Sequence, residues 1–345
     1  MESQQDTAPE AQSAGASSGN RNISSRLIVN ALPVNDEERK RFVQAAGGIR
    51  QKFVNSVADR GNMLWHAEVP EELQTEVTAI LGNVKPEQAS ACPRLEWLQT
   101  WSAGVDRYVA PGALGEHTVV TNATGAYGLP VGEHMFALMW ALMKQLPDYS
   151  RNQAAHRWED AGDVLSPQGG SVVVIGTGDI GSYFARLAKS VGMHTYGVRR
   201  DASRGADGID EIHSFDDLDD LLALADVVAM VVPSTPQTHH LLDARRLALL
   251  KPNAIVINAG RGDAIDPKAL LDVLHEGGIR GAGLDVTEPE PLPADDPLWD
   301  EPRCLITPHV AGGNHLAQTS TAIISIALEN VRRYAAGKPF INRRR

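Results

Sequence analysis

Cysteine is scarce in this sequence, because only Cys92 and Cys304 occur among its 345 residues. Two cysteines provide neither a disulfide framework nor the ligand set of a structural zinc site, so we expect free thiols in a reducing, cytoplasmic compartment. Positively charged residues are also few: the chain has 32 Lys and Arg residues and 43 Asp and Glu residues, which gives a net charge of −11. A chain this acidic is not expected to bind nucleic acid or an anionic membrane.

Long hydrophobic runs are absent as well. The most apolar window, residues 136–143, lies between Glu133 and Lys144 and is far shorter than the roughly 20 residues that a membrane-spanning helix requires. Hydrophobic residues still make up 43% of the chain, which is close to the average of globular proteins. The length favours two domains. We therefore expect a soluble, globular protein of two domains.

The first 25 residues differ in composition from the rest of the chain. Ser, Ala, Gln, Gly and Asn dominate them, and Met1 and Ile23 are their only large apolar side chains. Such a segment cannot bury enough apolar surface to order itself. It also lacks the basic start and apolar stretch of a signal peptide. We predict a disordered tail over residues 1–25.

Short apolar runs alternate with amphipathic stretches along the rest of the chain. They lie at residues 26–32, 78–81, 97–101, 119–121, 171–175, 194–198, 226–232, 254–258, 282–286 and 304–306. Strands that alternate with helices form parallel sheets with helical crossovers. Two glycines and a proline interrupt the pattern at residues 123–131, which marks a boundary. The pattern predicts an α/β protein with two doubly wound parallel-sheet domains.

A glycine-rich turn follows directly after the apolar run at residues 171–175. Its sequence is Gly176-Thr177-Gly178-Asp179-Ile180-Gly181. Apolar residues at helical spacing follow, so the turn joins a strand to a helix. Gly176 permits the tight turn, Gly178 lets the backbone approach a pyrophosphate, and Gly181 lets the helix pack closely. The helix N-terminus favours the phosphates. We predict a dinucleotide site here that includes Asp179 and Ile180.

The residues after the next strand indicate which dinucleotide binds. An NAD site usually has Asp or Glu there, which binds the ribose hydroxyls, whereas this sequence has Arg199 and Arg200. A guanidinium binds a 2′-phosphate that a carboxylate would repel. We predict a preference for NADP(H), with NAD(H) possible as a weaker coenzyme. The alternative is a solvated basic pair followed by Asp201, whose carboxylate itself reaches the ribose.

Three further clusters each follow an apolar strand. They are Asn258-Ala259-Gly260-Arg261-Gly262, the segment from Gly283 to Pro291 with Asp285 and Glu290, and the segment Thr307-Pro308-His309-Val310-Ala311-Gly312. Strand carboxyl ends share one edge of a parallel sheet, where doubly wound folds bind ligands. With the glycine turn, and with Ser102-Ala103-Gly104-Val105-Asp106 and Val131-Gly132-Glu133-His134 upstream, these clusters make the chain resemble the D-isomer-specific 2-hydroxyacid dehydrogenase family.

The resemblance implies roles for individual residues. It assigns His309 as general acid/base, Glu290 as the acid that pairs with it, and Arg261 as the cation that binds the substrate carboxylate and carbonyl oxygen. Reduction of a 2-keto acid needs such a cation and such a proton donor. The resemblance further implies that the backbone of Ala103 and Gly104 binds the substrate carboxylate. Its coenzyme contacts are implied at Val232, Pro233, Ala259, Asp285 and His309.

The resemblance also implies an architecture. A Rossmann coenzyme domain, residues 124–308, is inserted into a flavodoxin-like substrate domain formed by residues 26–123 and completed by residues 309–345. Members are usually homodimers, and the helix near residues 131–143 is expected to pack across the interface. Its apolar composition would look the same if it were buried within one chain.

Several activities remain open within the family. The arginine pair resembles NADPH-dependent glyoxylate and hydroxypyruvate reductases, the leading interpretation. Glu290 disfavours formate dehydrogenase, which pairs its histidine with glutamine. An NAD-dependent phosphoglycerate dehydrogenase of short form is one alternative, and a dinucleotide-sensing corepressor that binds partner peptides is another. The substrate is a small 2-keto or 2-hydroxy acid of unspecified side chain.

One histidine pair stands outside these clusters. His239 and His240 are adjacent, and neighbouring residues on one element do not ordinarily face one ligand together. No cysteine or carboxylate pattern nearby supports a metal site. We therefore predict that both are solvent-exposed and that the chain has no metal site.

Overall fold

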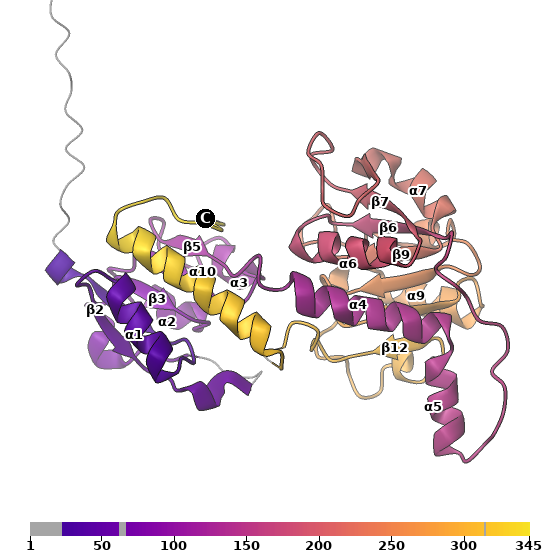
Figure 1. Cartoon of the computed structure of the whole chain (residues 1–345), viewed down its shortest axis with the longest axis horizontal. Coiled ribbons are helices and arrows are strands. Elements are labelled where there is room, and N and C mark those ends of the chain that lie inside the picture. The colour runs from indigo at the N-terminus through magenta and orange to yellow at the C-terminus, as the bar shows by residue number, and fades with distance from the viewer. Residues whose placement is uncertain (1–22, 62–66, 314) are drawn as a thin grey trace, which may run out of the picture.

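The computed structural model describes residues 23–61, 67–313 and 315–345. Two sheets organise these residues, one of five strands and one of seven, and all of their strand pairs are parallel. Helices cover both sheets (Figure 1). The predicted α/β fold with two parallel-sheet domains is confirmed.

The first sheet has the strand order β2-β1-β3-β4-β5, the flavodoxin-like order. Its strands are β1 (Leu27–Asn30), β2 (Arg50–Phe53), β3 (Ala79–Leu81), β4 (Trp97–Gln99) and β5 (Val119–Thr121). Its helices are α1 (Asp36–Ala45), α2 (Pro86–Ser90), α3 (Asp106–Val109) and α10 (Ala317–Ala335). The C-terminal α10 returns to lie along α1 (Figure 1), so the two ends of the described chain build this sheet together.

The second sheet has the order β12-β11-β10-β9-β6-β7-β8, which is the Rossmann order with one added strand. Its strands are β6 (Ser171–Ile175), β7 (His194–Val198), β8 (Glu211–His213), β9 (Val227–Met230), β10 (Ile255–Asn258), β11 (Gly281–Leu284) and β12 (Cys304–Ile306). Its helices are α4 (Gly128–Met143), α5 (Leu146–Ala154), α6 (Asp179–Ser190), α7 (Leu218–Leu224), α8 (Ala244–Leu247) and α9 (Pro267–His275). The central strands are buried on both faces because helices lie on each side.

Six short 3-10 helices complete the described elements. They are η1 (Ile23–Ser25), η2 (Val57–Gly61), η3 (Glu71–Leu73), η4 (Phe215–Asp217), η5 (Gly262–Ala264) and η6 (Pro297–Trp299). The first of these bears on the expected tail. Residues 1–22 lie outside the described residues, but Ile23–Ser25 form η1, and the Ser25 carbonyl accepts a hydrogen bond from Arg94. The last three residues of the expected tail therefore belong to the folded structure.

Helix α4 contacts both halves of the second domain, the half built on β6 to β8 and the half built on β9 to β12. It packs on α6 and on strands β10 and β11, and its inward face buries Met135, Leu138, Met139 and Leu142. Most of its apolar surface is thus covered within one chain. Phe136 and Trp140 lie on its other face, half-buried and in edge-to-face contact. Among the described residues, no helix is long and apolar enough to cross a membrane.

Candidate active site

The glycine turn after β6 fits a dinucleotide. Gly176 has a φ of +99°, and a Cβ there would lie 2.5 Å from the Val231 carbonyl oxygen. A Cβ on Gly181 would lie 2.0 Å from the Gly176 oxygen. Gly178 faces open space, with nothing within 4 Å of a Cβ, at the N-cap of the 12-residue helix α6. Two glycines are thus required by packing, and the third leaves room beside helix N–H groups for a pyrophosphate.

Asp179 has an additional role that the glycine pattern does not reveal. Its Oδ2 accepts hydrogen bonds from the backbone N–H groups of Gly125 (3.0 Å), Tyr127 (3.3 Å) and Gly128 (2.9 Å). The carboxylate is therefore directed towards the segment that leads into α4. Ile180 lies half-buried beside it. The predicted coenzyme contacts of both residues stay predictions.

The two arginines after β7 differ in environment. Arg199 is half-buried, and its Nη1 donates to the carbonyls of Arg204 and Gly205 at 3.1 Å each. Arg200 is exposed. The Asp201 carboxylate accepts hydrogen bonds from the backbone N–H and hydroxyl of Ser203, and the Ser203 hydroxyl lowers the pKa of Asp201. Asp201 thus holds its own turn, the exposed guanidinium of Arg200 is accessible to a ligand, and the predicted coenzyme contacts of Arg199 and Arg200 stay predictions.

The loops after β9 and β10 contact each other at the carboxyl-end edge of the second sheet. Val232 is buried, whereas Pro233 is exposed and Ala259 is half-buried. A Cβ on Gly260 would lie 2.8 Å from the Val232 nitrogen, so the two loops approach closely. This packing places the three predicted coenzyme contacts at the edge of the sheet that carries the glycine turn.

His309 and Glu290 form a direct pair. His309 Nδ1 lies 2.5 Å from Glu290 Oε1, and the two side chains are 48% and 42% exposed, respectively, so solutes can reach them. The hydrogen bond to Glu290 raises the pKa of the His309 imidazole, although burial and the charge of Arg261 act in the opposite direction. The hydrogen bond from His309 likewise lowers the pKa of Glu290. The pair thus favours an imidazolium beside a carboxylate.

Asp285 holds the turn that carries His309. Its buried carboxylate accepts hydrogen bonds from the Val310 and Ala311 N–H groups at 2.9 and 3.0 Å. It also accepts one from the Thr307 hydroxyl at 2.6 Å. His309 itself has a φ of +52°, a conformation that a non-glycine residue adopts rarely. Asp285 stabilises this turn, and its implied contact with the coenzyme stays a prediction.

Arg261 is held by a carboxylate from the other domain. Its Nε and Nη2 donate to Asp106 Oδ2 at 3.0 and 2.7 Å, and its Nη1 donates to the Gly260 carbonyl. A Cβ on Gly104 would lie only 2.1 Å from Arg261 Nη2. Only glycine allows the guanidinium to come this close to the loop. The geometry therefore joins Arg261 to the Ala103-Gly104 loop.

The Ala103-Gly104 loop is held by hydrogen bonds to its carbonyls. The carbonyls of Ser102 and Ala103 accept hydrogen bonds from Thr100 Oγ1 and Asn122 Nδ2, respectively, and the Gly104 carbonyl accepts one from the Ser102 hydroxyl. Within the described part of the chain, the Ala103 and Gly104 N–H groups have no hydrogen-bond partner. Two free amide donors beside a guanidinium form a suitable site for a carboxylate.

Comparison with known proteins adds the decisive observation. Residues 136–311 match the NAD binding domain of the D-isomer specific 2-hydroxyacid dehydrogenases. The chain is 32% identical over 258 residues to a glyoxylate/hydroxypyruvate reductase B of Pectobacterium carotovorum, covering 72% of this chain and 79% of the relative. The chain belongs to the D-isomer-specific 2-hydroxyacid dehydrogenase family. As the sequence predicted, it is an NAD(P)-dependent oxidoreductase.

Solved structures of this dehydrogenase family have the same fold. A family member from Aeromonas salmonicida is 31% identical, with a TM-score of 0.76 over 93% of this chain and 99% of that one. A dehydrogenase from Xanthobacter autotrophicus, in complex with NADPH and MES, is 28% identical, with a TM-score of 0.74 over 93% and 98%. Other relatives are named D-3-phosphoglycerate dehydrogenase, and the chain spans about half the length of each.

Sequence reasoning missed two side chains at this dehydrogenase site. Asp106 was quoted within a family segment but received no role, and the structure pairs it with Arg261. His134 was likewise quoted within a family segment without a role, and its Nε2 lies 2.9 Å from the Thr307 hydroxyl and 3.7 Å from Asp285 Oδ1. For Asp106, the only indication in the sequence was its position two residues after Gly104. The sequence had no signal for His134.

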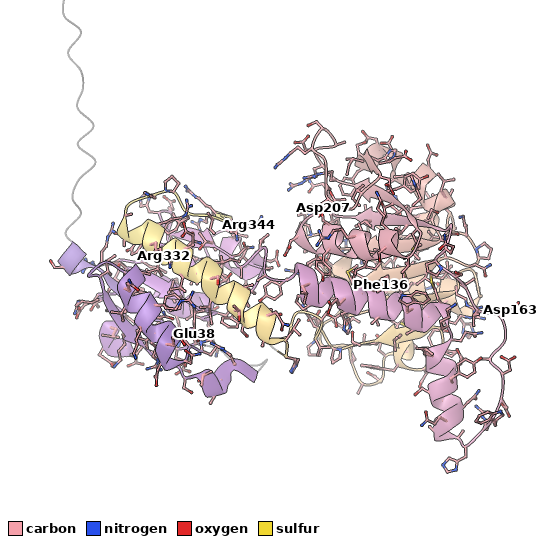
Figure 2. The ribbon with its side chains drawn as sticks, viewed as in Figure 1. Glu38, Phe136, Asp163, Asp207, Arg332 and Arg344 are labelled. Carbon is pink, nitrogen blue, oxygen red and sulfur yellow. The ribbon has the colours of Figure 1, made fainter. Side chains whose placement is uncertain are left out.

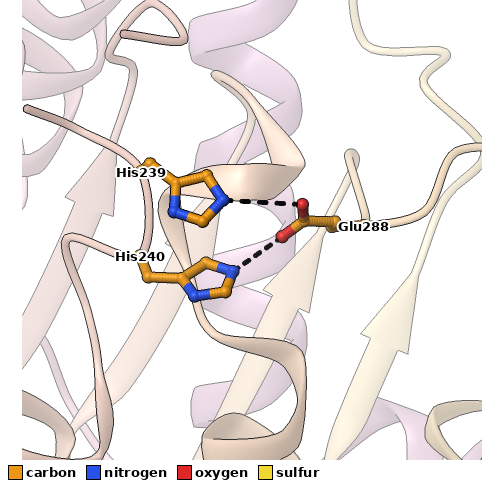
Figure 3. A group of neighbouring side chains, drawn as sticks. All are labelled: His239, His240 and Glu288. Carbon is orange, nitrogen blue, oxygen red and sulfur yellow. Dashed lines mark hydrogen bonds and ion pairs between the residues drawn. The ribbon is translucent and has the colours of Figure 1, made fainter. Parts of the chain in front are cut away.

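The interpretation of the histidine pair was wrong in its geometry. The side chains of His239 and His240 do not diverge, because their rings stack with centroids 4.0 Å apart and both Nε2 atoms are directed towards Glu288 (Figure 3). His240 has a φ of +48°, which turns the chain so that consecutive side chains no longer diverge. The rule of opposite directions holds for regular strands, not for this turn.

Proposed function

We propose that this dehydrogenase reduces a small 2-keto acid with NADPH. The observation that carries the proposal is the His309–Glu290 pair on the same domain edge as Arg261, whose guanidinium lies against Gly104 of the Ala103-Gly104 loop. A proton donor and a carboxylate site are what reduction of a 2-keto acid requires of the protein.

The side chains divide the chemistry between them. Arg261 and the amides of Ala103 and Gly104 bind the substrate carboxylate and orient its carbonyl. Glu290 holds His309 through Nδ1, which directs Nε2 towards the substrate. When bound, the reduced nicotinamide supplies the hydride to C2. His309 donates its Nε2 proton to the carbonyl oxygen and is left as a neutral imidazole hydrogen-bonded to Glu290.

The test is consumption of NADPH, with NADH in parallel, against glyoxylate, hydroxypyruvate, pyruvate and branched or aromatic 2-keto acids. Turnover with a 2-keto acid is the expected result, and the best substrate reports the size of the pocket. Absence of turnover with every acid and both coenzymes would overturn the proposed activity and favour a sensing role.

The coenzyme preference rests on Arg200. It is exposed where the 2′-phosphate would lie, and the NADPH complex of the Xanthobacter relative supports this choice. We expect Arg200→Ala to lower kcat/KM for NADPH about 10- to 150-fold, the equivalent of a charged hydrogen bond of about 1.5–3 kcal/mol, with little effect on NADH. Steady-state kinetics with both coenzymes measure this effect.

The matched control for Arg200 is Arg332→Ala. Arg332 is also an exposed arginine, but it lies on α10 of the first domain and pairs with Glu329 (Figure 2). Its substitution should leave both coenzymes unaffected. A higher kcat/KM for NADH than for NADPH in the unaltered protein would show that the predicted preference is wrong.

We also propose that the protein is a homodimer. Large apolar side chains are exposed on α5 and in the segment after it, namely Leu146, Tyr149, Trp158 and Val164, and Phe136 lies on the outward face of α4 (Figure 2). A groove of about 690 Å³ lies nearby, lined in part by Pro147, Arg280 and Arg303. Exposed apolar surface of this kind marks protein interfaces. Sedimentation equilibrium should give twice the 37.1 kDa chain mass.

A reducing, cytoplasmic location is the last part of the proposal. Cys92 and Cys304 are free in the structure. Burial raises the pKa of Cys92 to about 11 and that of Cys304 to about 12, so both stay as inert thiols at neutral pH. Fractionation of the source cells, followed by immunodetection, tests the location.

A further inference from the structure

The cluster of His239, His240 and Glu288 joins two loops of the second domain (Figure 3). The histidines lie in the loop after β9, and Glu288 lies in the loop after β11, close to Glu290 in sequence. The His240 N–H donates to the Asp263 carbonyl at 2.7 Å, which fixes the turn at its positive φ. The backbone thus holds both imidazoles on the same side of the loop.

The three side chains converge on one point. His240 Nε2 lies 2.9 Å from Glu288 Oε2, and His239 Nε2 lies 3.9 Å from Glu288 Oε1. One ligand atom from each residue lies within 4.8 Å of the other two. Tetrahedral Zn²⁺ has bonds of about 2.0–2.2 Å to nitrogen and oxygen, which separates its ligands by roughly 3.3–3.5 Å. The two separations from Glu288 lie on either side of this value. Because the imidazole planes are only 25° apart, metal binding requires one ring to rotate about its Cβ–Cγ bond so that both Nε2 lone pairs are directed at the same ion.

The chemistry of the three donors selects the kind of ion. Imidazole nitrogen suits Zn²⁺, Cu²⁺ and Ni²⁺, whereas Ca²⁺ and Mg²⁺ prefer oxygen ligands. All three side chains are between one third and about one half exposed, so an ion can enter and water can occupy its remaining position. Two neutral imidazoles and one carboxylate carry a net negative charge that attracts a divalent cation.

We propose that His239, His240 and Glu288 bind one divalent transition-metal ion, with Zn²⁺ as the probe. This site is independent of the proposed reaction, because none of the three residues belongs to its machinery. The bound ion links the loop after β9 to the loop after β11. Since an ion that binds the folded chain stabilises it by mass action, the ion makes this edge of the domain harder to unfold.

Isothermal titration of the tag-free, full-length protein with Zn²⁺ tests the proposal. We expect one saturable site per chain and a rise in Tm of several degrees. His239→Gln should weaken the affinity by more than about tenfold, which is the least that loss of even an outer-shell partner costs a metal site. It should also remove most of the rise in Tm.

The control variant is His194→Gln. His194 also contacts carboxylates, with its Nε2 2.7 Å from Glu211 Oε1, but it lies on β7 away from the cluster. Its substitution should leave the titration unchanged. Absence of saturable Zn²⁺ binding would overturn the proposal even without a variant. Binding that persists in His239→Gln, or that disappears in His194→Gln, would overturn it as well.

Discussion

Replacing His309 by Gln is expected to lower kcat for 2-keto acid reduction about 10²- to 10⁴-fold, the usual contribution of a general acid. Glutamine retains a polar side chain that can still reach Glu290, but it cannot donate a proton to the carbonyl oxygen at neutral pH. His309 is one of the implied coenzyme contacts, but the glycine turn and Arg200, which bind the phosphates in the proposed complex, are untouched, so NADPH binding should be retained while turnover is lost. Single-turnover kinetics and fluorescence titration of NADPH measure the two quantities separately.

The matched control for this variant is His275→Gln. His275 lies at the C-terminal end of α9 and its side chain is 85% exposed, so its substitution should leave kcat unchanged. Equal turnover by His309→Gln and the unaltered protein would remove His309 from the reaction. A loss of NADPH binding that accounts for the whole effect would contradict its role as proton donor.

Glu290→Gln is expected to move the pH dependence of the reaction. The Glu290 carboxylate raises the pKa of His309, and reduction requires the protonated imidazole. The value of kcat/KM should therefore be constant below the pKa of His309 and fall about tenfold per pH unit above it. Glutamine removes the negative charge, so the pKa drops and the fall begins at lower pH. Activity at low pH should be retained far better than activity at high pH.

The reverse reaction provides the internal check on this variant. Oxidation of the 2-hydroxy acid needs neutral His309, so its rate rises with pH, and the same substitution should move that rise to lower pH. A role of Glu290 in structure alone would lower both rates equally at every pH. A pH profile of Glu290→Gln that overlays that of the unaltered protein would show that the carboxylate does not set the pKa of His309.

Much of the fold was predictable because its central strands are continuous apolar runs. Among the strands of the described residues, only β2 and β8 were not predicted, and both are edge strands. Their sequences, Arg-Gln-Lys-Phe and Glu-Ile-His, are polar because one side of each strand has no neighbouring strand and much of its surface meets solvent. The apolar pattern that identified the other strands is therefore absent from these two.

The main site residues were predictable because each follows a strand directly. Arg261 follows β10 and His309 follows β12, so topology alone brings them to one edge. The pairing of Asp106 with Arg261 was not predictable, since it joins residues 155 positions apart on different domains. The shared orientation of His239 and His240 depends on one unusual φ, which the sequence does not encode in any pattern we could recognise.

Two aspartates of the second domain hold the two chain segments that connect the domains. Asp179 holds the Gly125 N–H, whereas the preceding Thr124 carbonyl is held by Asn342 from the first domain. The Thr124 carbonyl and the Gly125 N–H belong to one planar peptide group, so the same rigid unit is held from both domains. On the return path Asp285 accepts a hydrogen bond from the Ala311 N–H, so the chain is held to the second domain as far as that residue. His309 and the glycine turn therefore belong to the second domain, and the Ala103-Gly104 loop with Asp106 is the part of the site that the first domain contributes.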